Sequence, residues 1–216
     1  MEYLLKDREP KEALRYFEEI SAIPRGSGNE EAISQYLLDF AKAHGLDAYR
    51  DSAWNVYITK PGSAGCESLP PLMLQGHTDM VCEKNHNVDH DFTKDPIKLV
   101  VEGNILRADG TTLGADNGVA VAWMLSILAD DSLKHPPLEC VFTASEEVGL
   151  IGAHNLEFDR IHARRLINLD CGPEGVFCCG SAGGQVTDLR LPLRREEAQG
   201  LPLTIRIRGL SGGHSG

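Results

Sequence analysis

The sequence lacks the features of a membrane-spanning or exported protein. Its longest apolar run, 119–128, is interrupted by Ser126 and falls well short of the ~20 residues that a bilayer-spanning helix needs. The first seven residues contain neither the basic segment nor the apolar segment of a signal peptide. We therefore expect a cytoplasmic protein without a membrane partner.

Basic residues and regularly spaced cysteines are also scarce. The 216 residues include 21 Lys and Arg against 32 Asp and Glu, a net charge of −11 that repels phosphate and argues against a nucleic-acid partner. None of the six cysteines forms a Cys-x-x-Cys pair, so reduced thiols are expected rather than a disulfide framework. Adjacent Cys178 and Cys179 would point to opposite faces of a strand, which disfavours a shared metal ion. No G-x-G-x-x-G or G-x-x-x-x-G-K-[ST] motif is present to predict a nucleotide site.

Strand-like and helix-like patterns alternate along most of the chain. Helical spacing of apolar residues predicts helices over 10–20, over a segment that stops at Gly45, and over 118–129. Ser27 and Glu30 match a capping box at the start of the second helix. The remaining predicted elements are a short helix at 152–156 and strands at 47–51, 55–59, 72–75, 97–101, 105–108, 138–143 and 166–169, of which 97–101 and 105–108 would form a hairpin. This alternation indicates the α/β class.

The last part of the chain changes pattern. Segments 185–191 and 203–207 alternate apolar and polar residues, which is typical of half-exposed strands. They predict a domain boundary near Gly183 and Gly184, dividing the chain into 1–183 and 184–216.

Imidazole and acidic groups follow the predicted strands at their ends, where open α/β sheets bind ligands. His77 and Asp79 follow strand 72–75 and would point to the same side. They suit either a metal-binding imidazole oriented by a carboxylate or a loop histidine hydrogen-bonded to a loop aspartate. Asp170 follows strand 166–169 and is equally compatible with a plain turn.

Three more carboxylates stand beside other predicted elements. Asp116 lies near the start of helix 118–129 in a glycine-rich loop, where it would either cap the helix or bridge two cations. Glu146 and Glu147 repel each other unless a cation or a shared proton compensates. One of them could bind a metal while the other addresses its water; the alternative is a solvated turn.

One imidazole and several carboxylates form a ligand set that suits zinc, cobalt or manganese. Metal-assisted hydrolysis is the reaction class that such residues serve. The cations would polarise a carbonyl group and lower the pKa of a shared water, and a free carboxylate would accept its proton.

Five stretches carry a more specific signal: QGHTDMV at 75–81, HDFTKDPI at 90–97, GTTLGADNG at 110–118, Glu146-Glu147, and GGHSG at 212–216. With these motifs, the chain resembles the aminoacyl-histidine dipeptidases (peptidase D), co-catalytic zinc peptidases with an aminopeptidase-like fold. The resemblance covers essentially the whole chain. It implies a mixed central sheet flanked by helices in a catalytic domain over 1–183, followed over 184–216 by the first strands of an α+β lid and dimerisation domain.

The resemblance also implies a ligand set for two Zn²⁺ ions per full-length chain, with Co²⁺ or Mn²⁺ as alternatives. His77, Asp116 and Asp170 would complete one site, with Asp116 bridging to a second ion that Glu147 also binds. The peptide bond between Asp116 and Asn117 is expected to be cis, as it often is in this family.

The remaining implied roles concern catalysis and substrate. Glu146 would be the general base acting on a zinc-bridged water, Asp79 would orient His77, and His214 would approach the substrate. The implied activity is hydrolysis of dipeptides, of the Xaa-His type. The alternatives are a deacylase or aminopeptidase of the same fold, or an inactive metal-binding fragment.

Family members are about twice as long as this chain and carry the last histidine ligand of the second zinc in a C-terminal segment. We therefore expect the chain to be an N-terminal fragment with little dipeptidase activity of its own. The lid domain would make a homodimer in the complete protein.

Overall fold

The computed structural model describes residues 3–172, 175–180, 187–194, 196–197 and 199–209. These residues divide into two compact units, one ending at Asp170 and the other beginning at Cys171. All helices and strands of the described residues belong to the first unit. The predicted boundary at Gly183 and Gly184 lies outside the described residues and stays a prediction.

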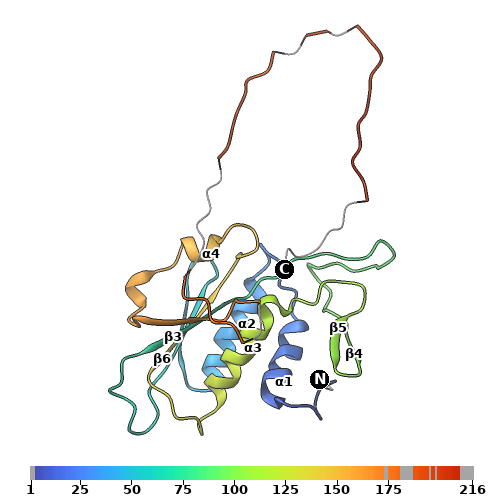
Figure 1. Ribbon diagram of the computed structural model, residues 1–216. Coiled ribbons are helices and arrows are strands. Elements are labelled where there is room, and N and C mark those ends of the chain that lie inside the picture. Colours follow the sequence, from blue (N-terminus) through green and yellow to red (C-terminus); the bar gives the residue numbers. More distant parts are fainter. Residues whose placement is uncertain (1–2, 173–174, 181–186, 195, 198, 210–216) are drawn as a thin grey trace. The chain divides into compact units, whose positions relative to one another are not determined.

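A five-stranded mixed sheet forms the centre of the first unit (Figure 1). Its strand order is β1-β2-β6-β3-β7, with bounds β1 Asp47–Arg50, β2 Val56–Lys60, β3 Leu72–His77, β6 Leu138–Thr143 and β7 Arg165–Asn168. Strand β3 pairs in parallel with β6 and with β7. Strand β2 pairs in antiparallel fashion with β1 and with β6. The predicted mixed central sheet is confirmed. A separate hairpin, β4 (Leu99–Glu102) and β5 (Ile105–Ala108), is confirmed as well.

Two helices pack on this sheet, α2 (Glu31–Ala43) and α3 (Ala115–Ala129), and α1 (Lys11–Ser21) packs against α3. Helix α3 is apolar nearly all round because it lies between β3 and α1 (Figure 1). Two shorter elements follow β6: helix α4 (Ile151–His154) and the 3₁₀ helix η1 (Phe158–Arg160).

The alternation of side chains along the strands divides the core between the two faces of the sheet. Val56 and Ile58 of β2 join the main cluster with helices α1, α2 and α3, whereas Tyr57 between them packs with Val141 and Ile161 in a smaller cluster.

Within the described residues, no helix combines the length and the apolar character needed to span a membrane.

Two sequence-based expectations are wrong. Helix α2 begins after Glu30 without a side-chain cap, so Ser27 and Glu30 do not form a capping box; their side chains bind other partners described below. The described parts of 185–191 and 203–207 contain no strand. Their apolar side chains are exposed, Leu189 at 92% and Ile205 at 89%, and a strand requires a hydrogen-bonded neighbour.

Candidate metal centre

The parallel strands bring the predicted site residues to one edge of the sheet. His77, the last residue of β3, pairs with Thr143, the last residue of β6. Glu146 and Glu147 follow β6 within four residues, and Asp170 follows β7, the neighbour of β3 on its other side. The carboxyl ends of three adjacent strands therefore carry three of the four predicted groups of site residues.

Helix α3 supplies the fourth group because its first turn lies against β3. A Cβ atom on Gly76 would stand 2.4 Å from Oδ1 of Asn117 and 2.9 Å from Cβ of Ala120, so only glycine permits this close approach. The backbone leaves helical geometry at Asp116 and Asn117, and the peptide bond between them is cis, as expected. Asn117 donates from Nδ2 to the carbonyl oxygen of Leu169, which ties the start of α3 to the segment that carries Asp170.

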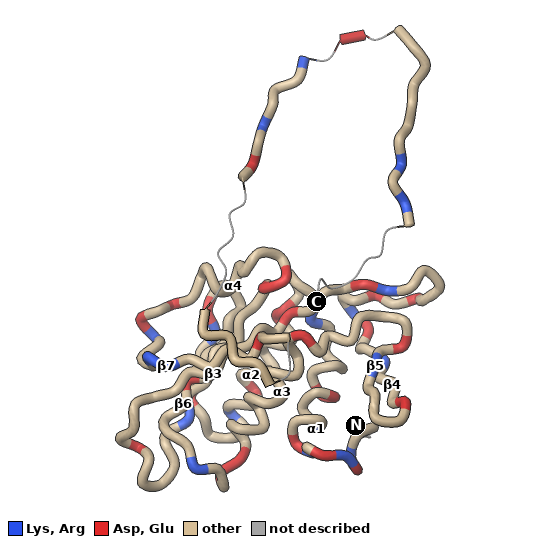
Figure 2. Tube along the Cα trace, viewed as in Figure 1, with Lys and Arg blue, Asp and Glu red and all other residues tan. Residues whose placement is uncertain are grey.

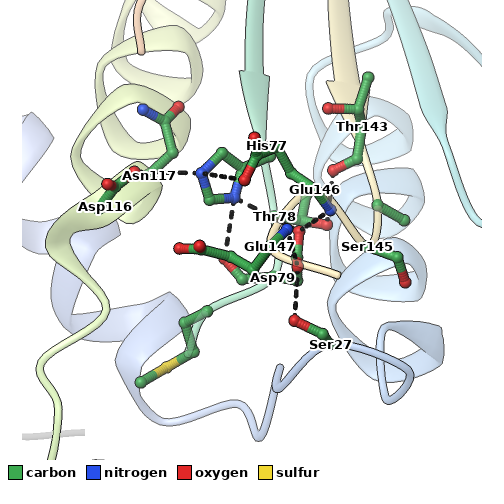
Figure 3. Close-up of polar contacts among 12 residues, drawn as sticks. Ser27, His77, Thr78, Asp79, Asp116, Asn117, Thr143, Ser145, Glu146 and Glu147 are labelled. Carbon is green, nitrogen blue, oxygen red and sulfur yellow. Dashed lines mark hydrogen bonds and ion pairs between the residues drawn. The ribbon is translucent and has the colours of Figure 1, made fainter. Parts of the chain in front are cut away.

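The imidazole of His77 lies at the centre of the carboxylates (Figure 3). Its Nε2 is 3.1 Å from Oδ1 of Asp116, 3.8 Å from Oε2 of Glu146 and 3.9 Å from Oδ2 of Asp170. The side chain of His77 is 1% exposed, whereas that of Asp116 is 42% exposed, so the ring is buried and the carboxylates face outward from it.

Asp79 contacts Nδ1, the other nitrogen of the His77 ring. Nδ1 of His77 lies 3.0 Å from the backbone carbonyl oxygen of Asp79 and 3.3 Å from its Oδ1. The same carboxylate accepts hydrogen bonds from the backbone N–H groups of Glu146 and Glu147 and from Oγ of Ser27 (Figure 3). Burial opposes ionisation of Asp79, but these hydrogen bonds outweigh it and lower its pKa. Asp79 is thus a buried anion in contact with both His77 and the loop after β6.

The charges of the centre shift two further pKa values. Burial alone would lower the pKa of His77, but the hydrogen bond and charge of Asp79, with the charges of Asp170 and Glu146, raise it to about 9. Burial raises the pKa of Glu146, and the charges of Asp170 and Glu147 add to that effect against the opposing charge of His77. A raised pKa makes a carboxylate a stronger base than an unperturbed one.

The donor set fits a divalent cation. Two groups of side chains have ligand atoms within 4.8 Å of one another: His77 with Asp116 and Asp170, and His77 with Glu146 and Glu147. Figure 2 shows Asp and Glu positions gathered in this part of the first unit. One imidazolium cannot neutralise so many carboxylates, whereas oxygen ligands with one imidazole nitrogen are a set that zinc and similar ions bind.

His214, the expected substrate-contacting residue, lies outside the described residues. Sequence reasoning also missed three residues that contact the centre from the connection between α1 and α2: Arg25, Ser27 and Glu30. The glycines around Asp116 are the signal that the sequence offers, because a residue without a Cβ atom lets another group approach the backbone closely. The side chain that does so is Arg25, which donates to the carbonyl oxygen of Gly114.

Known proteins resemble this chain in sequence and fold, although no family model matches it. Over 214 residues, 98% of its length, the chain is 42% identical to the cytosol non-specific dipeptidase of Escherichia coli strain K12 and covers 44% of that protein. The crystal structure of aminoacylhistidine dipeptidase from Vibrio alginolyticus matches with a TM-score of 0.77 and 42% identity, over 79% of this chain and 35% of that one. A tripeptidase structure from Staphylococcus aureus matches with a TM-score of 0.64 and 28% identity, over 76% of this chain and 44% of that one.

The mixed sheet, its helices and these matches define an α/β protein of the aminopeptidase-like fold. Within that class, the chain is homologous to one protein named cytosol non-specific dipeptidase and to one named aminoacylhistidine dipeptidase, which confirms the resemblance seen in the sequence. The chain spans less than half the length of these relatives, 44% of the first and 35% of the second.

Proposed function

We propose that the natural polypeptide containing these residues is a cytoplasmic, metal-dependent peptidase that hydrolyses dipeptides, with Xaa-His as the preferred type. The observation that carries this proposal is the gathering of three carboxylates within 4 Å of one nitrogen of the buried His77 ring. The relatives support the same conclusion, because the two at 42% identity are named cytosol non-specific dipeptidase and aminoacylhistidine dipeptidase.

In this proposal the metal ligands are those that the sequence motifs suggest. His77, Asp116 and Asp170 hold one zinc ion, and the distances from Nε2 of His77 to the two carboxylates, 3.1 and 3.9 Å, support this set. Asp116 and Glu147 take part in a second site. Zinc supplies Lewis acidity, which polarises a substrate carbonyl group and lowers the pKa of water.

Glu146 is the general base of this proposal. Its carboxylate lies beside His77 on the same edge of the sheet, and its raised pKa suits the transfer of a proton from the attacking water to the leaving amine. Asp79 takes no part in that transfer. It fixes the ring of His77 and, through the N–H groups of Glu146 and Glu147, the loop that carries the base.

The substitution Glu146→Gln in the full-length polypeptide tests this assignment. A hydrolase should lose at least about a hundredfold of its turnover, the usual contribution of a general base, while its zinc content stays unchanged. Glu157→Gln is a matched control on the surface near η1, where the carboxylate binds Arg160. Unchanged turnover in Glu146→Gln would overturn the role of Glu146 and favour a non-catalytic binding module.

The substrate class is tested by assaying several peptides with the same preparation. Xaa-His and other dipeptides, tripeptides and N-acylated amino acids should be compared at equal concentration. Tripeptides are included because of the similarity to a tripeptidase at 28% identity. Faster hydrolysis of acylated amino acids would replace the dipeptidase proposal with a deacylase.

A further inference from the structure

The connection between α1 and α2 contacts three of the four segments that form the candidate metal centre: the loop after β3, the loop before α3 and the loop after β6. Arg25 binds the loop after β3 and the loop before α3, Ser27 binds Asp79, and Glu30 binds the loop after β6. These three residues lie within six positions of one another, whereas the loops that they bind lie far along the chain. We call residues 25–30 the brace segment.

Arg25 joins two loops with one side chain. Its Nη1 donates to the carbonyl oxygen of Thr78 at 2.9 Å, and its Nη2 donates to that of Gly114 at 2.5 Å. Thr78 follows His77 directly, and Gly114 lies two residues before Asp116. The planar guanidinium group therefore links the loops that carry the histidine and the bridging aspartate, in a geometry that a single ammonium group does not reproduce.

Burying the charged side chain of Arg25 costs free energy because the guanidinium group loses its hydration. It is 2% exposed, and burial lowers its pKa to about 10 against the opposing charge of Asp79, so the group stays cationic at neutral pH. Among the described residues, the hydrogen-bond acceptors of Arg25 are backbone carbonyl groups, those of Thr78, Asp79 and Gly114. A buried cation held in this way beside several carboxylates both positions the loops and compensates negative charge.

The glycines around Asp116 leave room for this guanidinium group. A Cβ atom on Gly114 or on Gly118 would stand 2.6 Å from Nη2 of Arg25. Gly114 also has a φ of +71°, a conformation that favours glycine. Both glycines of the GADNG motif are therefore explained by the close approach of Arg25.

Ser27 adds a contact with the loop after β3, and Glu30 contacts the loop after β6. Oγ of Ser27 donates to Oδ2 of Asp79 at 2.7 Å, and Oε1 of Glu30 accepts from Oγ of Ser145 at 2.5 Å. Ser145 precedes Glu146, and Glu30 is 2% exposed. The backbone also pairs, since the N–H group of Met80 donates to the carbonyl oxygen of Arg25.

We propose that the brace segment is the positioning element of the metal centre, with Arg25 setting the separation between His77 and Asp116. This inference rests on the proposed function, because it assigns these contacts to the geometry of a bound divalent cation. Arg25, Ser27 and Glu30 are positioning residues that act through the ligands.

The test uses the full-length polypeptide and Co²⁺ as the probe, measured with no substrate present. Arg25→Lys keeps the charge but cannot reach both loops. We expect its affinity for Co²⁺ to fall about 10–100-fold and the visible spectrum of bound Co²⁺ to change, as for the loss of other groups that orient metal ligands. With a dipeptide substrate, kcat should fall while KM stays close to that of the wild type. Ser27→Ala, which removes one hydroxyl group, should weaken Co²⁺ binding in the same direction.

Lys60→Met is the control for a purely structural effect. Lys60 is also a buried cation that donates to backbone carbonyl groups, those of Leu128 and Asp130, but it does so at the far end of α3. Helix α3 has 15 residues and is about 22 Å long. Lys60→Met should lower the urea midpoint and leave the Co²⁺ affinity and spectrum of the folded protein unchanged.

The outcomes separate the two proposals. Wild-type Co²⁺ affinity and spectrum in both Arg25→Lys and Ser27→Ala would overturn the positioning role, while the proposed function would stand. A wild-type protein that binds no divalent cation would overturn the proposed function and this inference with it. If Arg25→Lys does not fold, Ser27→Ala still decides, because an unchanged Co²⁺ spectrum in that variant contradicts the role of the brace segment.

Discussion

Nε2 of His77 lies 3.1 Å from Oδ1 of Asp116, although the two residues are 39 positions apart in the sequence. Two features of the fold produce this contact. The parallel register ends β3 at the sheet edge, and Gly76 lets the first turn of α3 approach that strand. A buried imidazole and a half-exposed carboxylate thus meet at the point where several other carboxylates converge.

Cation binding should depend steeply on pH because, without a cation, a proton occupies the ring of His77 that would bind the cation. The pKa of His77 is raised to about 9, so without a cation the ring is protonated at neutral pH, and a binding metal must displace that proton. Affinity should therefore increase as pH rises, by about tenfold per pH unit between about pH 6 and about pH 8. Calorimetric titrations with Zn²⁺ over this range would measure it.

His44→Gln provides the control for that titration. His44 lies at the end of α2 and bonds the carbonyl oxygen of Phe40, so its replacement should leave the pH dependence unchanged. An affinity that stays flat across the range would show that the ring of His77 is not protonated before the cation binds.

The approach of α3 to β3 should be sensitive to a single added methyl group. In Gly76→Ala the new Cβ atom would stand 2.4 Å from Oδ1 of Asn117, so the helix or the strand must shift. We expect the free energy of unfolding to fall by about 1–3 kcal/mol, the usual cost of overpacking. Urea denaturation measures this, and metal affinity should fall as well because Asp116 moves with the helix.

Gly200→Ala is the matched substitution for that experiment. An added Cβ atom at Gly200 meets no atom within 4 Å, so the urea midpoint should stay within error of the wild type. Equal midpoints for the two variants would mean that the contact between α3 and β3 tolerates a larger separation than the structure indicates.

The parts of the fold that the sequence predicted are those with local signatures. Strands β3 and β6 are short apolar runs, α3 is a long one, and the groups that follow each strand are acidic or imidazole side chains. Parallel pairing then brings His77 and Glu146 to one edge, as the rule for open α/β sheets predicts. Local pattern and a single topological rule were sufficient for the main features of the site.

The brace segment could not be predicted in this way. Arg25 binds carbonyl groups that lie 53 and 89 positions away, and backbone acceptors leave no mark in a sequence. Ser27 and Glu30 were misleading because serine followed three residues later by glutamate is also the pattern of a capping box. Ser27 instead donates to the buried carboxylate of Asp79, Glu30 accepts from the hydroxyl group of Ser145, and α2 begins without a side-chain cap.

The number of ions that the 216-residue chain holds tightly follows from a shared ligand. Both groups of ligand atoms among the described residues include His77, and its outward Nε2 can bind one ion at a time. Without an imidazole of its own, a second ion would depend on carboxylates that are partly exposed, which bind zinc weakly. After extensive dialysis, metal analysis of the isolated chain should therefore find one zinc ion per molecule, and His77→Ala should reduce that number toward zero. Two ions retained per wild-type chain would contradict this prediction and show that Asp116 and Glu147 hold a second ion without further help.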